Sequence, residues 1–233
     1  MKRKVLGVIG GVGPLSTAYF MEVVIRMTDV QTDQEHIDMV VLNHTEIPDR
    51  TDYILDSSKP NPVPLMLSDA RRLEELGADI IVTPCNTAHY FYHELSSAVS
   101  VPFLNMIDET AAELSRMGTR KAGVLATNGT VHTGLFQEAL EKRGIEAVLP
   151  SPDGQRNVME IIYQNVKAGV PSDREKWNAI TLEMEESGCD HVILGCTELS
   201  LLRREFSLGR YFVDALEVLA ARSIEACGKP VRR

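Results

Sequence analysis

Two cysteines occupy equivalent places in a pattern that the chain contains twice. The segment LEELGADIIVTPC, residues 73–85, reappears as MEESGCDHVILGC, residues 184–196. Each copy reads as the end of a helix, a glycine, a hydrophobic strand, and a cysteine where the strand ends. Two equivalent halves that face each other would bring the thiols of Cys85 and Cys196 to one cleft from opposite sides. Acid and base groups on opposite faces of one carbon are what inversion of a stereocentre requires.

A second internal similarity supports the first. GVIGGVGPLSTAYFME, residues 7–22, matches GVLATNGTVHTGLFQE, residues 123–138, at a shift of 116 residues. Both copies read as a short apolar strand, a polar or glycine turn, and a helix. Similarity at such a long period indicates a duplicated architecture.

The residues around the two cysteines are suited to binding anions. Cys85 is followed by Asn86 and Thr87, and Cys196 by Thr197 and Glu198. The first backbone N–H groups of a helix and its dipole favour carboxylates and thiolates. Asn86 and Thr87 are either helix caps or carboxylate ligands.

Other candidate ligands follow neighbouring strands. Gly11 belongs to a glycine turn whose backbone amides can approach a small substrate. The turn resembles a dinucleotide fingerprint, but Ser16 replaces the third glycine, so nucleotide binding is the weaker interpretation. The hydroxyls of Thr127 and Thr130 lie after a strand of the second half. Two cations complete the candidates, Arg50 and Lys167, and the guanidinium fork of arginine suits a carboxylate.

Other thiol chemistries fit less well. The Cys and His spacings match no structural zinc pattern, so no metal is expected. A Cys–His hydrolase needs His89 or His132 beside a thiolate and a third orienting group, which the sequence does not supply. A thiol redox protein needs both sulfurs within disulfide range. A non-catalytic dicarboxylate or amino-acid binding protein on a duplicated scaffold would not need paired thiols.

Apolar strands that alternate with helices predict an α/β fold with mostly parallel sheets flanked by helices, in two pseudo-symmetric lobes. Ligands then bind beyond the carboxyl ends of the strands, where the candidate residues fall. We expect lobe 1 to comprise residues 1–99 plus 209–233, and lobe 2 residues 100–208. The predicted strands are 4–10, 37–43, 79–83, 101–106, 121–126, 145–148, 190–194 and 212–214. The predicted helices are 15–29, 65–76, 108–117, 131–143, 156–167, 173–187 and one that ends near 226.

Composition limits the partners and the compartment. The chain has 233 residues, enough for one large or two small domains. A net charge of −9 disfavours nucleic acids and anionic membranes, and no run of about 18 uncharged apolar residues occurs. The basic and then apolar start reads better as a strand than as a signal peptide. The four cysteines form no framework, which predicts free thiols and a cytoplasmic protein.

Five motifs together resemble the cofactor-independent aspartate/glutamate racemase family. They are GGVGP (10–14), IPDR (47–50), PCNTAH (84–89), LATNGT (125–130) and GCTEL (195–199). The resemblance implies two pseudo-symmetric lobes, an active site between them, no pyridoxal phosphate or other cofactor, and a homodimer. It implies the following roles: Cys85 and Cys196 as the two bases, Asp49 and Glu198 as acidic neighbours that set thiol protonation, Arg50 and Lys167 on the side-chain carboxylate, and Asn86, Thr87, Thr127 and Thr197 on the α-carboxylate and amino group.

The chain departs from the branch of the family that makes glutamate for cell walls. That branch looks like Asp-Ser-Gly near its start and Cys-Thr-His at its second cysteine, whereas this chain has Gly10-Gly11 and Glu198 there. The expected substrate is therefore aspartate, or aspartate and glutamate, with a two-base exchange of the Cα proton. Related isomerases that act on maleate or hydantoins remain alternatives, and retention of both cysteines argues against an arylmalonate decarboxylase.

Overall fold

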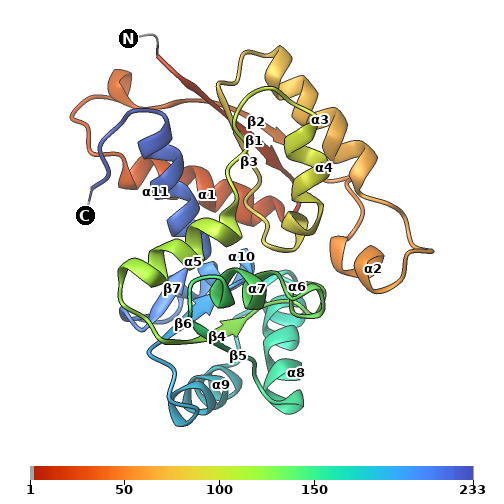
Figure 1. Ribbon diagram of the computed structural model, residues 1–233, viewed down its shortest axis with the longest axis vertical. Coiled ribbons are helices and arrows are strands. Elements are labelled where there is room, and N and C mark those ends of the chain that lie inside the picture. Colours follow the sequence, from red (N-terminus) through yellow and green to blue (C-terminus); the bar gives the residue numbers. More distant parts are fainter. Residues whose placement is uncertain (1–2, 233) are drawn as a thin grey trace. The chain divides into compact units, whose positions relative to one another are not determined.

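Residues 3–232 of the computed structural model are described, and they divide into two units that each contain a parallel sheet (Figure 1). The first unit comprises residues 3–106 and 216–232, and the second comprises residues 107–215. The boundaries expected from the sequence lay at 99/100 and 208/209. Within residues 3–232, no helix combines the length and the apolar character needed to cross a membrane.

The first unit is built on a three-stranded sheet. The strands are β1 (Val5–Gly10), β2 (Asp38–Asn43) and β3 (Ile80–Val82), all parallel and in the order β2-β1-β3. Its helices are α1 (Pro14–Met27), η1 (Asp33–Glu35), α2 (Arg50–Leu55), α3 (Val63–Glu75), η2 (Thr87–Phe91), α4 (Tyr92–Ser97) and α11 (Ala215–Ala226). The order places the turns after all three strands at one edge, where ligands of open α/β sheets bind.

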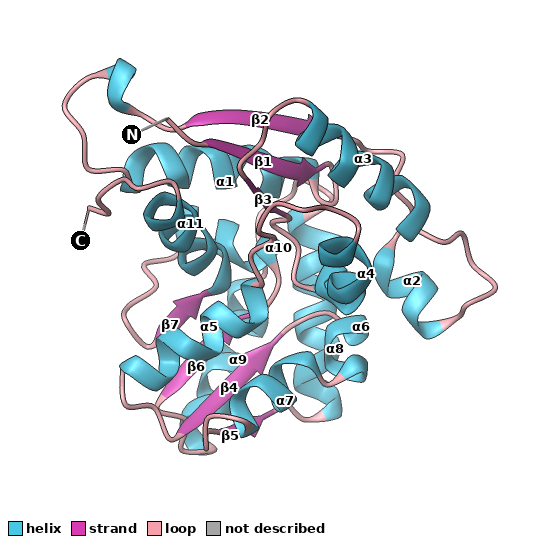
Figure 2. Ribbon diagram, turned by 45° about the horizontal axis from the view of Figure 1, so that its top comes forward, coloured by secondary structure: helices cyan, strands magenta, loops and turns pink. Residues whose placement is uncertain are grey.

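Two glycines of β1 show how the sheet is covered on both faces. A side chain at Gly7 would meet Leu73 of α3, whereas one at Gly10 would meet Thr17 of α1. Positions 7 and 10 point to opposite faces of a strand, so α3 and α1 cover opposite faces (Figure 2). The glycines let both helices approach the central strand closely, which is the packing a doubly covered parallel sheet needs.

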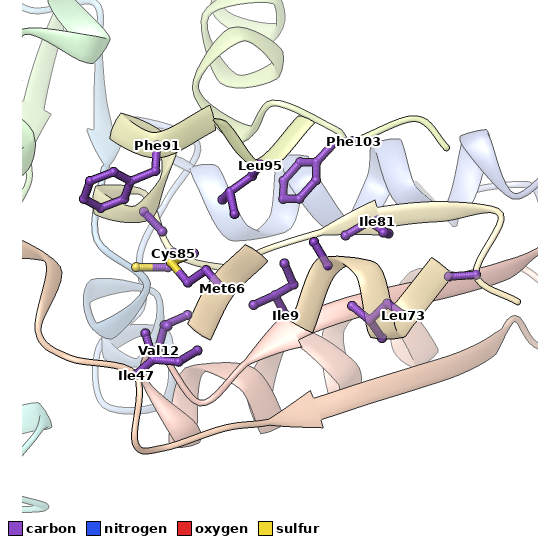
Figure 3. Close-up of a cluster of buried hydrophobic side chains, with 13 residues drawn as sticks. Ile9, Val12, Ile47, Met66, Leu73, Ile81, Cys85, Phe91, Leu95 and Phe103 are labelled. Atoms are coloured by element: carbon purple, nitrogen blue, oxygen red, sulfur yellow. The ribbon is translucent and has the colours of Figure 1, made fainter. Parts of the chain in front are cut away.

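A cluster of buried side chains under α3 and η2 forms part of the core of this unit. Figure 3 shows Cys85 at one end of the cluster, near Val12, Ile47, Met66 and Phe91. Ile81 and Leu73 lie toward its other end. The segment that carries Cys85 is therefore held by packing against the interior.

The second unit is built on a four-stranded sheet. Its strands are β4 (Lys121–Leu125), β5 (Glu146–Val148), β6 (His191–Leu194) and β7 (Phe212–Asp214), parallel and in the order β5-β4-β6-β7. Its helices are α5 (Met106–Arg116), α6 (Asn128–Thr133), α7 (Leu135–Glu141), α8 (Pro152–Glu160), the π-helical segment η3 (Ile161–Val166), α9 (Arg174–Glu186), α10 (Thr197–Ser200) and η4 (Leu201–Arg204).

Both sheets pair their strands in the same register. Gly7 of β1 pairs with Ile81 of β3, and Gly123 of β4 pairs with Val192 of β6. The shifts of 116 and 111 residues that relate the two sequence repeats carry the first pair onto the second. The duplication inferred from the sequence is thus present as a shared strand order and register.

Several local expectations were wrong, each for a visible reason. Strand 212–214, expected in the first lobe, pairs with β6 in the second sheet. The predicted helix 131–143 is divided at Gly134, whose φ of 70° ends one helix and starts the next. The predicted strand 101–106 is reduced to a single bridge between Ile81 and Phe103. The predicted helix 156–167 is α8 followed by the π-helical segment η3.

Candidate active site

The twelve site residues predicted from the sequence divide equally between the two units, and nine of them lie within five residues of the carboxyl end of a strand. The first unit holds Gly11, Asp49, Arg50, Cys85, Asn86 and Thr87. The second unit holds Thr127, Thr130, Lys167, Cys196, Thr197 and Glu198. Asp49 and Arg50 come six and seven residues after β2, and Lys167 follows η3 rather than a strand.

Cys85 lies in an apolar environment and is held through its backbone. The residue is buried, and its backbone N–H donates to the Thr83 carbonyl at 2.9 Å. Its own carbonyl accepts a hydrogen bond from Nδ1 of His89, also at 2.9 Å. The conformation of the cysteine turn is therefore fixed without engaging the sulfur.

His89 is a structural histidine rather than the base of a Cys–His pair. Its Nε2 accepts the backbone N–H of Met106 at 3.0 Å, so Nδ1 carries the proton that it donates to Cys85. Both ring nitrogens are thus engaged with the backbone. This arrangement disfavours the Cys–His hydrolase alternative and gives His89 the role of holding the cysteine turn.

Asn86 stands out because it is a buried amide with unsatisfied hydrogen-bonding groups. It is 2% exposed, and neither its amide nitrogen nor its amide oxygen has a hydrogen-bond partner among residues 3–232. Buried polar groups are nearly always paired, because an unpaired one costs about 1–3 kcal/mol. Asn86 follows Cys85 directly, so its amide is available to a substrate at this position. Ser16, in the first turn of α1, has a similarly buried and unpaired hydroxyl that the sequence analysis did not select.

The glycine turn and the start of α2 complete the first unit's contribution. Gly11 has a φ of 81°, and a Cβ there would lie 2.4 Å from the backbone of His44, so only glycine fits. The carboxylate of Asp49 caps α2, accepting the N–H groups of Thr51 at 2.8 Å and Asp52 at 3.1 Å. The guanidinium of Arg50 is buried and donates to the Pro48 carbonyl at 3.0 Å.

Cys196 differs from Cys85 because its sulfur is itself hydrogen-bonded. The thiol donates to Oε2 of Glu198 at 2.9 Å, and both side chains are buried. Burial raises the pKa of the Cys196 thiol well above its ordinary value, and the charge and the hydrogen bond of Glu198 raise it further. The backbone of Glu198 and the charge of Lys167 act in the opposite direction. Cys196 is therefore a protonated thiol in this arrangement.

A buried acid holds the short helix that follows Cys196. Oγ of Ser200 at the end of α10 donates to Oδ1 of Asp214 at 2.7 Å, and Arg203 lies 3.5 Å from the other carboxylate oxygen. Asp214 ends β7 beside β6, so it ties α10 to the sheet edge. Asp214 was not among the residues expected from the sequence, although an acid at the end of a strand was a usable signal.

Two threonines form the first turn of α6. Thr127 is the N-cap, and its Oγ1 accepts the N–H of Thr130 at 3.3 Å. The two hydroxyls lie 3.2 Å apart, and both residues are buried. This pair explains why both threonines occur after β4, and it presents hydroxyl groups at the start of a helix.

Lys167 is the exposed cation of the second unit's site. Its ammonium lies 4.0 Å from the centre of the Tyr163 ring, a cation–π contact. The lysine directly follows the π-helical segment η3, and π-helical turns are frequent at functional sites. Its positive charge slightly opposes the rise in the pKa of the Cys196 thiol.

A resident metal has no evident binding site. Among residues 3–232, no group of three or more His, Cys, Asp or Glu side chains could hold a metal ion. All four cysteines are free and buried.

Each of the two parallel-sheet units places a buried cysteine in the turn after a strand, and comparison with known proteins identifies the class that has this arrangement. Residues 9–222 match the Asp/Glu/Hydantoin racemase family, so the chain belongs to this family and is an amino-acid racemase, an isomerase. A solved aspartate racemase from Picrophilus torridus is 33% identical, with a TM-score of 0.85 over 98% of this chain and 96% of the other.

Two further relatives are similar over nearly their whole length. An aspartate racemase homologue from Pyrococcus horikoshii OT3 is 25% identical, with a TM-score of 0.77 over 97% of this chain and 100% of the other. The broad specificity amino-acid racemase RacX of Bacillus subtilis is 27% identical over 94% of this chain and 96% of its own.

Proposed function

We propose that this racemase interconverts L- and D-aspartate by a two-base mechanism in which Cys85 and Cys196 act on opposite faces of Cα. The observation that carries the proposal is the repeated strand-end cysteine, buried in both units and set in the same strand register. Free amino acids have a weakly acidic Cα–H. Two bases on opposite faces allow one to remove the proton while the other replaces it.

The proton balance assigns a resting role to each sulfur. The Cys85 thiolate takes the Cα proton, and the electron pair left on Cα is delocalised into the α-carboxylate. The Cys196 thiol then gives its proton to the other face, which leaves Cys85 as thiol and Cys196 as thiolate. The hydrogen bond from Cys196 to Glu198 supports this assignment, since it holds the proton on Cys196 in the absence of substrate.

The developing negative charge on the carboxylate needs hydrogen-bond donors. Asn86 offers an unpaired amide, and Gly11, Thr87, Thr127, Thr130 and Thr197 belong to turns or helix starts at the sheet edges. Donors placed where charge develops contribute several kcal/mol to catalysis. Arg50 and Lys167 are the cations proposed for the side-chain carboxylate, and Asp49 is proposed to act near Cys85 while it caps α2.

Aspartate is preferred as substrate for two reasons. The Picrophilus torridus relative of 33% identity is an aspartate racemase. Glu198 also stands at the position where the glutamate racemase branch looks like Cys-Thr-His, so a glutamate replaces the histidine. The 27% identity to RacX supports a second candidate, a racemase that accepts several amino acids.

Exchange of the α-proton in deuterium oxide tests the proposal directly. The purified chain, with no added cofactor, is incubated with L-aspartate, and deuterium at Cα and formation of D-aspartate are followed by NMR and chiral chromatography. Both are expected at comparable rates, and other L-amino acids in parallel reactions measure specificity. If aspartate binds with neither exchange nor inversion, the proposal is wrong, and exchange with another amino acid would favour the second candidate.

We also propose a compartment and an oligomeric state for the enzyme. Four free cysteines suit the reducing cytoplasm, and the family resemblance favours a homodimer. Light scattering on the purified chain measures the oligomeric state.

A further inference from the structure

A histidine–aspartate pair lies beside the glycine turn of the first unit and has no part in the proposed proton transfer. Nδ1 of His44, just after β2, lies 2.8 Å from Oδ2 of Asp69 on α3. Asp69 is 4% exposed, whereas the ring of His44 is partly exposed, with Nε2 3.8 Å from the exposed Glu46 carboxylate. Burial of a carboxylate without a hydrogen-bonded partner is costly, and His44 is such a partner for Asp69.

The backbone of His44 connects this pair to the site. Its N–H donates to the carbonyl of Gly10 at 3.3 Å, and its backbone is the surface that excludes a side chain at Gly11. The His44 carbonyl accepts the N–H of Ile47 at 3.4 Å, which closes the turn 44–47. The guanidinium of Arg50 in turn donates to the Ile47 and Pro48 carbonyls. A continuous set of contacts thus runs from Asp69 through His44 to Arg50.

The other side of α2 borders a cavity. A cavity of about 340 Å³ lies beside the helix, and Tyr53, Ile54 and Phe91 are among the residues that line it. Tyr53 reaches across to Phe91, with ring centres 6.0 Å apart. Because α2 has only six residues and borders a cavity, its position depends strongly on the turn that precedes it.

We propose that His44 and Asp69 are positioning residues that hold the turn 44–49, and through it Arg50, in place for the substrate's side-chain carboxylate. This inference rests on the proposed function, in which Arg50 binds that carboxylate. Asp69 anchors the imidazole to α3, and the anchored backbone sets both the floor of the Gly11 turn and the start of α2. The pair contributes to substrate binding and takes no part in proton transfer.

Steady-state kinetics on a set of four variants test the role in binding. In His44→Ala, the KM for L-aspartate rises about tenfold, while kcat changes less than about threefold, because uniform binding is lost and the chemistry is retained. His44→Asn keeps an N–H donor near the position of Nδ1 and returns KM to within about threefold of wild type. His93→Ala, at an exposed histidine of α4 in the same unit, keeps both constants.

The double variant His44→Ala/Asp69→Ala separates positioning from simple stability. It leaves no uncompensated buried carboxylate, so its melting temperature recovers relative to His44→Ala. Its KM stays about tenfold raised, because the turn is still unanchored. A double variant with wild-type KM, or a His44→Ala protein with unchanged KM, overturns the proposal.

Hydrogen exchange gives a readout that does not depend on racemase activity. Amides of residues 47–55 exchange faster in His44→Ala than in wild type, whereas amides of β4 in the second unit do not change. If wild type has no activity on aspartate, the proposed function fails, yet the exchange still tests the anchor. Unchanged exchange at 47–55 shows that the pair does not hold this turn, whatever the substrate.

Discussion

Cys85 and Cys196 each lie in a turn between a parallel strand and a short helix, but the surroundings of the two sulfur atoms differ. Cys85 follows β3, which pairs in parallel with β1, and Cys196 follows β6, which pairs with β4 in the same register; both cysteines are buried. Cys85 is held by its carbonyl, through His89, and its neighbours are apolar. Cys196 is held by its thiol, through Glu198. A two-base racemase at rest needs this inequality, since one sulfur must start as the base and the other as the acid.

The divergence is concentrated in the residues just after each cysteine. At a shift of 111 residues, Asn86 corresponds to Thr197, Thr87 to Glu198, and His89 to Ser200. The carboxylate that raises the pKa of the thiol is thus present in one copy only, as is the histidine that binds the cysteine carbonyl. The two copies therefore keep the buried cysteine and differ in the residues around it, which is the asymmetry that the proposed two-base mechanism needs.

Removal of either thiol tests the comparison with the largest expected effect. Cys85→Ala and Cys196→Ala each lose racemisation by at least about 10⁴-fold, because no other base serves that face of Cα. Each variant retains slow exchange of the α-proton with solvent, on one enantiomer only, and the two variants favour opposite enantiomers. Deuterium incorporation into L- and D-aspartate measures this.

Cys227→Ala is the matched control, since it removes the buried free thiol that directly follows α11. Its activity stays within about twofold of wild type. Full racemisation by Cys85→Ala or Cys196→Ala contradicts the two-base assignment.

Glu198→Gln makes the two thiols more alike. It removes the negative charge that helps to raise the pKa of Cys196, so the pKa falls, although burial still holds it up. Below its pKa, the thiolate fraction grows tenfold for each unit that the pKa falls. Alkylation of Cys196 by iodoacetamide at pH 8 becomes faster, and racemisation slows by about 10²-fold as the resting asymmetry is lost.

The pH profile of alkylation shows independently in which direction the pKa of Cys196 changes. In wild type the pKa of Cys196 is raised well above that of an ordinary thiol, so its alkylation still accelerates with pH where an ordinary thiol has reached its plateau. In Glu198→Gln the plateau moves to lower pH, while the Cys85 rate in the same digests stays unchanged. An unaltered Cys196 profile shows that the carboxylate does not control this thiol.

Asn86→Leu tests whether the unpaired amide is kept for substrate. Leucine has a similar volume and removes the buried unpaired polar atoms, so the free energy of unfolding stays the same or rises by about 1 kcal/mol. The KM for aspartate rises about tenfold or more. Thr83→Val is the contrasting control, because the Thr83 hydroxyl is paired with the Ile9 carbonyl at 3.1 Å, and its loss costs about 1 kcal/mol. Denaturant unfolding and kinetics measure both, and a destabilised Asn86→Leu with normal KM contradicts the assignment.

Much of the architecture was predictable from the sequence because it follows from hydrophobic period and repetition. The apolar runs that became β1, β3, β4 and β6 were recognisable by composition, and the repeat aligned them in the right order. Strand 212–214 was assigned to the wrong half, because three residues of sequence do not state which sheet edge a strand will join. The π-helical turn before Lys167 could not be predicted from the helical pattern either, because the choice of i→i+5 over i→i+4 bonding in one turn depends on the packing around it.

The candidate site was predictable in its residue types and unpredictable in its pairing. Motif position indicated Cys85, Cys196 and Asn86, and the family resemblance implied Glu198 as an acidic neighbour of a thiol. The motif did not indicate that the buried Asn86 amide has no hydrogen-bond partner among residues 3–232, because the surrounding fold decides this. The contact between His44 and Asp69 joins residues that are 25 positions apart in the sequence, so no local sequence pattern predicts it. Such contacts are set by the fold and become visible only with it.

The smallest effect in this series concerns the cation of the second unit. Tyr163→Leu removes the ring beneath the Lys167 ammonium, a contact worth about 0.5–1 kcal/mol at an exposed site, so KM for aspartate rises about two- to fivefold with kcat unchanged. Tyr163→Phe keeps a ring and stays within about twofold of wild type. In the first unit, Arg50 is buried and held by carbonyl groups, so the two proposed carboxylate ligands are supported by different means. Equal KM values for Tyr163→Leu and Tyr163→Phe show that the ring does not orient the lysine, and that Lys167 reaches the substrate through its charge alone.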